Sequence, residues 1–195
     1  MASSLKDKRG RVKDDLIKKG PVKDKLTRFI AEPGKQEIVI ERTFNAPLEC
    51  IFRALTEPDF IPEWWGPRRL KTVVDKMDVK PGGTWRFIQH DASGKEYAFH
   101  GEYKEVLSPE RLVSTSEYED MPGHEVMQTV LLEEDIEQYV YGFEARTRMM
   151  IKDVFQSVED RDGMLKRGME EGVRESYDRL DELAARLCIR KKKAA

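Results

Sequence analysis

Residues 41–67 read ERTFNAPLECIFRALTEPDFIPEWWGP, and this stretch carries the clearest structural pattern in the chain. A β-rich run over residues 37–44 stops at Asn45-Ala46-Pro47. Pro47 suits the first position of a helix, because its missing N–H would have no partner there. The apolar residues that follow have helical spacing, namely Leu48, Ile51, Phe52 and Leu55. The stretch therefore predicts a strand followed by a short amphipathic helix.

A second short helix is expected between Thr56 and Gly66-Pro67. The Thr56 side chain can cap its start, and the Gly-Pro step would end it. Trp64 and Trp65 then lie at its C-terminal end, in a chain with only three tryptophans. Adjacent helical residues point about 100° apart. We therefore expect one tryptophan to enter the core and the other to border a cavity, and the sequence leaves open which does which.

Strand candidates then follow one another from residue 71 to residue 155, separated by Gly, Pro and Ser turns. They are KTVVDKMDVK, TWRFIQH, EYAFHGEYKEVL, RLVSTSEYE, HEVMQTVLLEE and GFEARTRMMIKDVF. Such regular spacing of turn signals indicates an antiparallel meander. In the last segment one set of residues alternates with charged neighbours and is expected to be buried, namely Phe143, Ala145, Thr147, Met149 and Ile151.

One long helix is expected over roughly residues 163–188. Its apolar stripe is dense in the C-terminal half, with Leu180, Leu183, Ala184 and Leu187. The N-terminal half of the same face mixes in small residues and reads Met169, Gly172, Val173 and Ser176. Either a cavity lies beneath this half, or a bulky residue such as Trp85 or Phe87 fills the notch. Three Glu–Arg pairs at i,i+4 spacing are expected on the far face: Glu170–Arg174, Glu175–Arg179 and Glu182–Arg186.

This order of segments resembles the SRPBCC superfamily, also called START-like or birch-pollen-allergen-like. The branch it is most similar to is the one related to the activator of the heat-shock-protein ATPase. The resemblance is carried by residues 41–67, DVKPGGTWRF, EYAFHGEYKEVLSPERLV, and TRMMI with the terminal helix. It implies an α+β helix-grip fold, with a curved antiparallel sheet of six or seven strands wrapped around a long C-terminal helix. Two short helices would follow the first strand, and a cavity would lie between sheet and helix.

The termini lie outside the resemblance. Residues 1–35 are expected to form a basic, partly helical or flexible arm, residues 36–190 the helix-grip domain, and residues 191–195 a basic tail. Residues 1–28 contain ten basic and four acidic side chains. Because no aromatic residues are interleaved with these charges, the arm lacks the pattern of a nucleic-acid site, and nucleic acid is not expected as a partner.

The sequence excludes several classes of function. The three histidines have no metal-ligand spacing, and no phosphate-binding or dinucleotide fingerprint occurs, so we expect neither a metal nor a cofactor. No catalytic constellation is visible. No run approaches the ~18 apolar residues of a membrane span. Cys50 and Cys188 have no metal or redox spacing, which indicates reduced thiols in a cytoplasmic protein.

The favoured function is binding of a small hydrophobic or aromatic ligand in the cavity. The candidate lining residues are Trp64, Trp65, Trp85, Phe87, Phe99, Tyr103, Met149, Met169, Gly172, Val173 and Ser176. One alternative is a co-chaperone-like interaction domain with a chaperone as partner. The other is a polyketide-cyclase-like or hydrolytic enzyme that uses Tyr103, Ser176 or Tyr177. Homodimerisation through sheet edges or helices stays open.

Overall fold

The fold was analysed in a computed structural model, which describes residues 27–134 and 145–193. Within these ranges eight antiparallel strands form one sheet in the order β1-β2-β8-β7-β6-β5-β4-β3. The strands are β1 (Thr27–Ile30), β2 (Glu37–Phe44), β3 (Lys71–Met77), β4 (Thr84–His90), β5 (Glu96–Leu107), β6 (Arg111–Tyr118), β7 (Val126–Glu134) and β8 (Thr147–Val154). The helices are α1 (Leu48–Thr56), α2 (Ile61–Trp64), α3 (Val158–Lys166) and α4 (Met169–Lys193).

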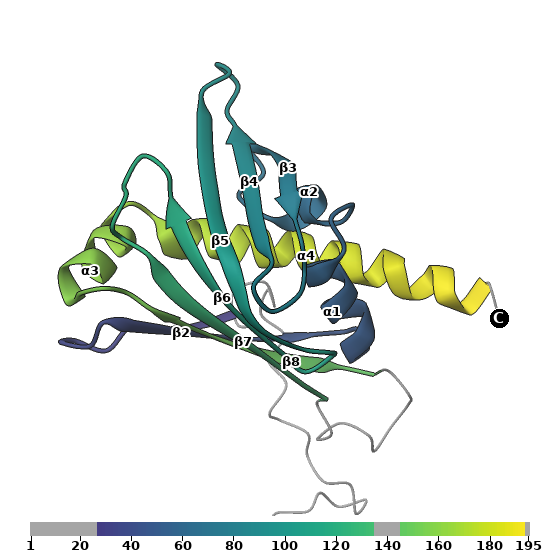
Figure 1. Cartoon of the computed structure of the whole chain (residues 1–195). Coiled ribbons are helices and arrows are strands. Elements are labelled where there is room, and N and C mark those ends of the chain that lie inside the picture. The colour runs from purple at the N-terminus through teal and green to yellow at the C-terminus, as the bar shows by residue number, and fades with distance from the viewer. Residues whose placement is uncertain (1–26, 135–144, 194–195) are drawn as a thin grey trace, which may run out of the picture.

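The sheet curves around α4, which runs across its concave side (Figure 1). Figure 1 also places α3 at one end of α4, while α1 and α2 pack against α4 further along. The buried face of α4 consists of Ser176, Tyr177, Leu180, Leu183, Ala184 and Leu187. The α+β helix-grip fold expected from the sequence is thereby confirmed.

Strand β1 brings the sheet to eight strands, beyond the six or seven expected. It pairs antiparallel with the Val39–Arg42 part of β2. The intervening turn contains Gly34 at φ 78°, a conformation that glycine adopts without steric strain. Part of the segment expected as an arm, residues 27–35, is therefore a hairpin arm of the sheet. The rest of that segment, residues 1–26, lies outside the described residues, as do residues 194–195 of the expected tail.

Burial alternates along the strands that form the floor of the molecule. In β8, Thr147, Met149 and Ile151 are buried as expected, while Arg148 and Lys152 are exposed. Phe143, at the start of the expected strand, lies outside the described residues. Ala145 is exposed, against expectation, because it precedes the first residue of β8. The same period in β2 buries its inward side chains, namely Ile38, Ile40, Arg42 and Phe44.

The two short helices begin differently from expectation. Pro47 is the residue before α1 rather than its first residue, with an extended backbone at ψ 150°. Thr56 does not cap α2, because its hydroxyl donates to the carbonyl of Phe52 at 2.7 Å within α1. Helix α2 begins only at Ile61 and has Pro62 in its first turn.

The long C-terminal helix is interrupted at Gly168, so the expectation of one continuous helix from residue 163 is wrong. Gly168 has φ 84°, and its N–H donates to the carbonyl of Leu165 at 3.1 Å. A glycine in the left-handed region just after the last turn is the usual way for a helix to end. Helix α3 therefore stops at Lys166, and α4 leaves in a new direction.

No helix in the described ranges is long and apolar enough to cross a membrane.

Candidate functional site

Trp64 and Trp65 occupy different environments, because Trp64 is the last residue of α2 while Trp65 follows it with an extended backbone at ψ 118°. Trp64 is only 7% exposed, and its indole N–H donates to the carbonyl of Ala54 at 2.9 Å. Trp65 instead packs edge-on against Phe87 and Phe99, with ring centroids 5.3 Å apart in both cases. Trp64 thus joins α1 and α2 in the core, whereas Trp65 faces the aromatic side chains of the sheet.

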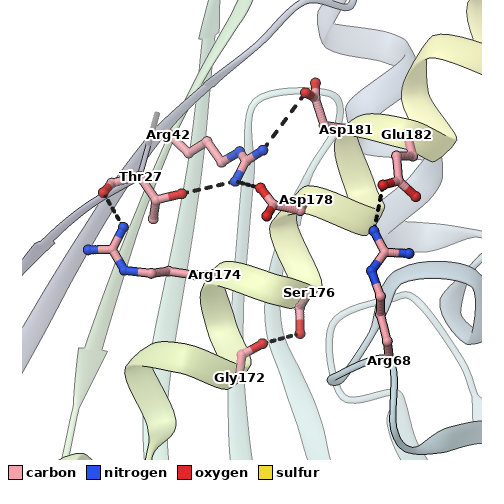
Figure 2. A network of polar contacts seen from close by, with 9 residues as sticks. All are labelled: Thr27, Arg42, Arg68, Gly172, Arg174, Ser176, Asp178, Asp181 and Glu182. Carbon is pink, nitrogen blue, oxygen red and sulfur yellow. Dashed lines mark hydrogen bonds and ion pairs between the residues drawn. The ribbon is translucent and has the colours of Figure 1, made fainter. Parts of the chain in front are cut away.

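In the turn after Trp65, both the N–H and the carbonyl of Gly66 are hydrogen-bonded to side chains of α4. The N–H of Gly66 donates to the hydroxyl of Ser176 at 3.1 Å, and its carbonyl accepts from Arg179 at 2.7 Å. Ser176 in turn donates to the carbonyl of Gly172 at 2.7 Å, within α4 (Figure 2). Gly66 itself has φ 91°, and a Cβ there would lie 1.8 Å from the Gln89 amide nitrogen. This position requires glycine, and the turn fixes where Trp65 points.

A small pocket of about 150 Å³, here called the tryptophan pocket, lies between α2 and the sheet. Its lining consists of Leu55, Ile61, Trp64, Trp65, Trp85, Phe87, Tyr103, Leu112, Ser114, Ser116, Gln128 and Val130. Trp85 fits because Gly101 lies opposite it on β5: a Cβ there would come within 2.7 Å of the indole nitrogen.

Four polar side chains form a row across the sheet, and three of them, Tyr103, Ser114 and Gln128, line this pocket. Strand pairing places Tyr103 beside Ser114, Ser114 beside Gln128, and Gln128 beside Asp153. The Gln128 amide donates to the Asp153 carboxylate at 2.9 Å. A β-bulge follows Tyr103, and bulges commonly re-aim side chains near functional sites. The concave face is therefore not uniformly apolar.

Burial keeps the tyrosines of this region neutral. It raises the pKa of Tyr103, which is only 6% exposed, and it raises the pKa of Tyr177 still further, with Asp153 adding to the effect. Among the described residues the Tyr103 hydroxyl has no hydrogen-bond partner. A neutral buried hydroxyl without a partner is a donor or acceptor available to a ligand.

A second, larger pocket of about 630 Å³ lies beneath α3 and the start of α4, and is here called the helix pocket. Its lining consists of Pro67, Arg69, Leu70, Gln89, Tyr97, Phe99, Ser116, Tyr118, Met121, His124, Val126, Phe155, Glu159, Asp160, Gly163, Met164, Arg167, Gly168, Met169 and Gly172. A Cβ added to Gly172 would meet no atom within 4 Å. Of the two interpretations of the small residues on α4, open space is therefore the one observed, and neither Trp85 nor Phe87 fills it.

Eight of the eleven candidate residues divide between the two pockets. Trp64, Trp65, Trp85, Phe87 and Tyr103 line the tryptophan pocket, and Phe99, Met169 and Gly172 line the helix pocket. Met149, Val173 and Ser176 line neither. Ser116 lines both pockets, so they adjoin at β6. Trp65 packs on Phe87 from one pocket and Phe99 from the other, so this aromatic cluster stands between the two.

Several lining residues were not foreseen. On β6, Ser114, Ser116 and Tyr118 share one face, and strand alternation could have grouped them once the inward face was known. Met164 and Arg167 line the helix pocket because the chain breaks at Gly168 between α3 and α4. The prediction of one helix over residues 163–188 could not place them there.

No group of three or more His, Cys, Asp or Glu in the described residues could hold a metal ion. His100 is exposed on β5 and lies 3.5 Å from Glu117. His124 lies at the helix pocket, where its Nδ1 is 2.8 Å from the Asp160 carboxylate. The residues present support binding through apolar contacts and hydrogen bonds.

A curved sheet around a C-terminal helix, with an apolar pocket between them, defines a helix-grip domain of ligand-binding type. The family model described as Activator of Hsp90 ATPase homolog 1-like protein matches residues 45–185. The chain belongs to this family, which confirms the resemblance found in the sequence.

Solved structures share the fold at low identity. A protein from Arthrobacter aurescens is 22% identical with a TM-score of 0.72, over 82% of this chain and 91% of its own. A Rhodobacter sphaeroides protein is 24% identical with a TM-score of 0.69, over 81% of this chain and 99% of its own. Protein Ms6760 from Mycobacterium smegmatis is 20% identical with a TM-score of 0.69, over 81% of this chain and 96% of its own. No curated protein matches the chain.

Proposed function

We propose that the protein binds a small hydrophobic or aromatic ligand in the helix pocket, in a cytoplasmic setting. The observation that carries this proposal is the open volume of about 630 Å³ with its largely aromatic and aliphatic lining. Ligand pockets typically occupy about 300–1,000 Å³ and combine apolar walls with a few polar groups. The tryptophan pocket, next to it, would accept a further small group of the ligand.

A neutral apolar fluorescent probe, N-phenyl-1-naphthylamine, tests the proposal. We expect saturable binding that quenches tryptophan emission, because Trp65 lies beside the helix-pocket residue Phe99. Gly172→Leu should weaken binding by about tenfold or more, since its side chain would occupy the open space.

Ala185→Leu is the matched control, since Ala185 lies on the exposed face of the same helix. It should leave binding unchanged. Equal affinity of both variants would show that the probe does not enter the helix pocket, and absence of saturable binding by the unmodified chain would contradict the proposal. Native mass spectrometry of the purified protein would report a co-purified ligand.

The family description favours a second candidate function, interaction with a chaperone. It predicts that the purified chain stimulates the ATPase activity of an Hsp90. Gly172→Leu separates the two functions, because it fills the helix pocket while leaving the outer surface of the sheet unchanged. The enzyme alternative is less well supported, because burial raises the pKa of Tyr103 and Tyr177 and so disfavours a phenolate base. The Ser176 hydroxyl is engaged at Gly66 and Gly172.

A further inference from the structure

Two arginines of the helix pocket differ from other arginines of the described chain. Arginines elsewhere mostly have a carboxylate within 4.0 Å, as in Arg42–Asp178, Arg53–Glu57, Arg68–Glu182, Arg86–Glu119, Arg148–Glu41, Arg174–Glu170 and Arg186–Glu63. Arg69 has neither a hydrogen bond nor an ion pair among the described residues. Within residues 27–134 and 145–193, the Arg167 side chain donates only to the thioether sulfur of Met121, at 2.6 Å. A thioether is a weak acceptor and leaves the positive charge uncompensated.

The comparison between Arg68 and Arg69 is the most direct. Arg68 is bonded to Glu182 of α4 at 2.5 Å (Figure 2). It also lies 3.9 Å from Glu175 on the same helix. Its chain neighbour Arg69 lines the helix pocket. One loop thus supplies one arginine to the scaffold and one to the pocket.

The acidic groups of the pocket do not neutralise these arginines. Asp160 is within 2.8 Å of His124, and its backbone N–H is bonded to Ser157. Glu159 is exposed in the first turn of α3, where the helix dipole favours a negative charge. Asp120, nearby, accepts from the Tyr118 hydroxyl at 2.7 Å. None of these carboxylates lies within 4.0 Å of either guanidinium.

We infer that the ligand of the helix pocket is an amphipathic anion: its apolar body contacts the aromatic lining, and its acidic oxygen group pairs with Arg69 and Arg167. This inference rests on the proposed function and adds the chemical class of the ligand. Guanidinium groups form charge-assisted hydrogen bonds with carboxylates and phosphates, and these bonds are roughly twice as strong as neutral ones. Both arginines are exposed, so a neutral ligand of the same length would leave their charges to water and would gain no charge-assisted hydrogen bond.

The test compares decanoate, decyl phosphate and decanol as competitors of N-phenyl-1-naphthylamine on the full chain at low salt. We expect either anion to displace the probe at a concentration about tenfold or more below that of decanol. The advantage should shrink as salt is added, because exposed charges are screened. Whichever anion is stronger identifies the acidic group as carboxylate or phosphate.

Variants then locate the charge recognition. Arg69→Gln and Arg167→Gln should each reduce the preference for the anion over decanol several-fold, and Glu159→Gln should increase it. Arg68→Gln is the matched control and should leave the preference intact.

Equal potency of decanoate, decyl phosphate and decanol would overturn the inference while leaving the proposed function in place. An equal loss in Arg68→Gln and Arg69→Gln would overturn it as well, since the effect would then reflect net charge. Failure of the probe itself to bind would count against the proposed function instead.

Discussion

Asp153 is the residue whose chemistry contrasts most with its surroundings. It lies on the inward face of β8, two residues beyond Ile151, and only 3% of it is exposed. Burial raises its pKa to about 6, although the hydrogen bond from Gln128 acts in the opposite direction. One hydrogen-bond donor does not compensate the carboxylate for the loss of water on burial, so the charged form is destabilised.

This shift makes the stability of the protein depend on pH in a defined direction. The pKa of Asp153 is raised from 3.8 in the unfolded chain to about 6 in the folded one, so the folded state binds more protons between these values. Asp153 therefore lowers the free energy of unfolding as pH rises from about 4 to 6. Above pH 6 the loss is complete, at roughly 2–3 kcal/mol.

Asp153→Asn removes this effect, because an amide side chain does not titrate. The amide oxygen can still accept the hydrogen bond from Gln128. We expect the variant to be more stable than the parent at pH 7.5, by up to about 2–3 kcal/mol. The gain should almost vanish at pH 3.5, where Asp153 is protonated in the folded state and mostly protonated in the unfolded state. Urea unfolding at the two pH values measures this difference, and a gain that is the same at both would contradict a titrating Asp153.

The strands were the elements best predicted by the sequence, because each local pattern was reinforced by its neighbours. Alternation along residues 147–151 was confirmed, since one face of β8 meets the core and the other meets solvent.

Predictions that depended on a choice between partners failed more often. Of the three expected i,i+4 pairs, Glu170–Arg174 is present, at 2.7 Å. Arg179 bonds instead to the carbonyls of Pro62 and Gly66, and Arg186 to the carboxylate of Glu63. Tertiary partners near α2 outcompete helical neighbours, and nothing in the local sequence reports them.

The α3–α4 junction allows a matched test with two glycines. Gly168 has φ 84°, so a Cβ there is strained even though it would meet no atom within 4 Å. We expect Gly168→Ala to lower the free energy of unfolding by about 1–2 kcal/mol. Gly172 has ordinary helical geometry and equally open space, so Gly172→Ala should raise it by up to about 1 kcal/mol. Thermal unfolding of both variants checks the prediction, and the same sign for both would contradict the assigned role of Gly168 as the end of α3.

At the scale of the whole molecule, Arg42 joins the beginning of the described chain to its end. Its guanidinium donates to the hydroxyl of Thr27 on β1 at 3.0 Å and to Asp178 on α4 at 2.7 Å, and lies 3.8 Å from Asp181 (Figure 2). Arg174 on α4 donates to the carbonyl of Thr27 at 2.7 Å. The edge strand β1 is therefore held both by β2 and by the helix that the sheet encloses.

Substitution of Arg42 should weaken the contact between the sheet and α4 and make the pairing of β1 with the sheet less stable. The side chain is buried while its acidic partners are partly exposed, so Asp178 and Asp181 can regain water when it is removed. We therefore expect Arg42→Ala to cost about 2–3 kcal/mol, below the 3–5 kcal/mol typical of a fully buried pair. Hydrogen exchange at the β1 amides should accelerate more than exchange in β7, since opening of β1 needs no global unfolding.

Arg28→Ala provides the comparison, because Arg28 lies on the same edge strand with its side chain 72% exposed and 3.6 Å from Glu41. An exposed pair of this kind contributes little, so the change should stay within about 0.5 kcal/mol. If Arg42→Ala were equally mild and left β1 exchange unaltered, the contacts of Arg42 with Thr27 and Asp178 would not be what holds the edge strand, and pairing with β2 alone would account for its position.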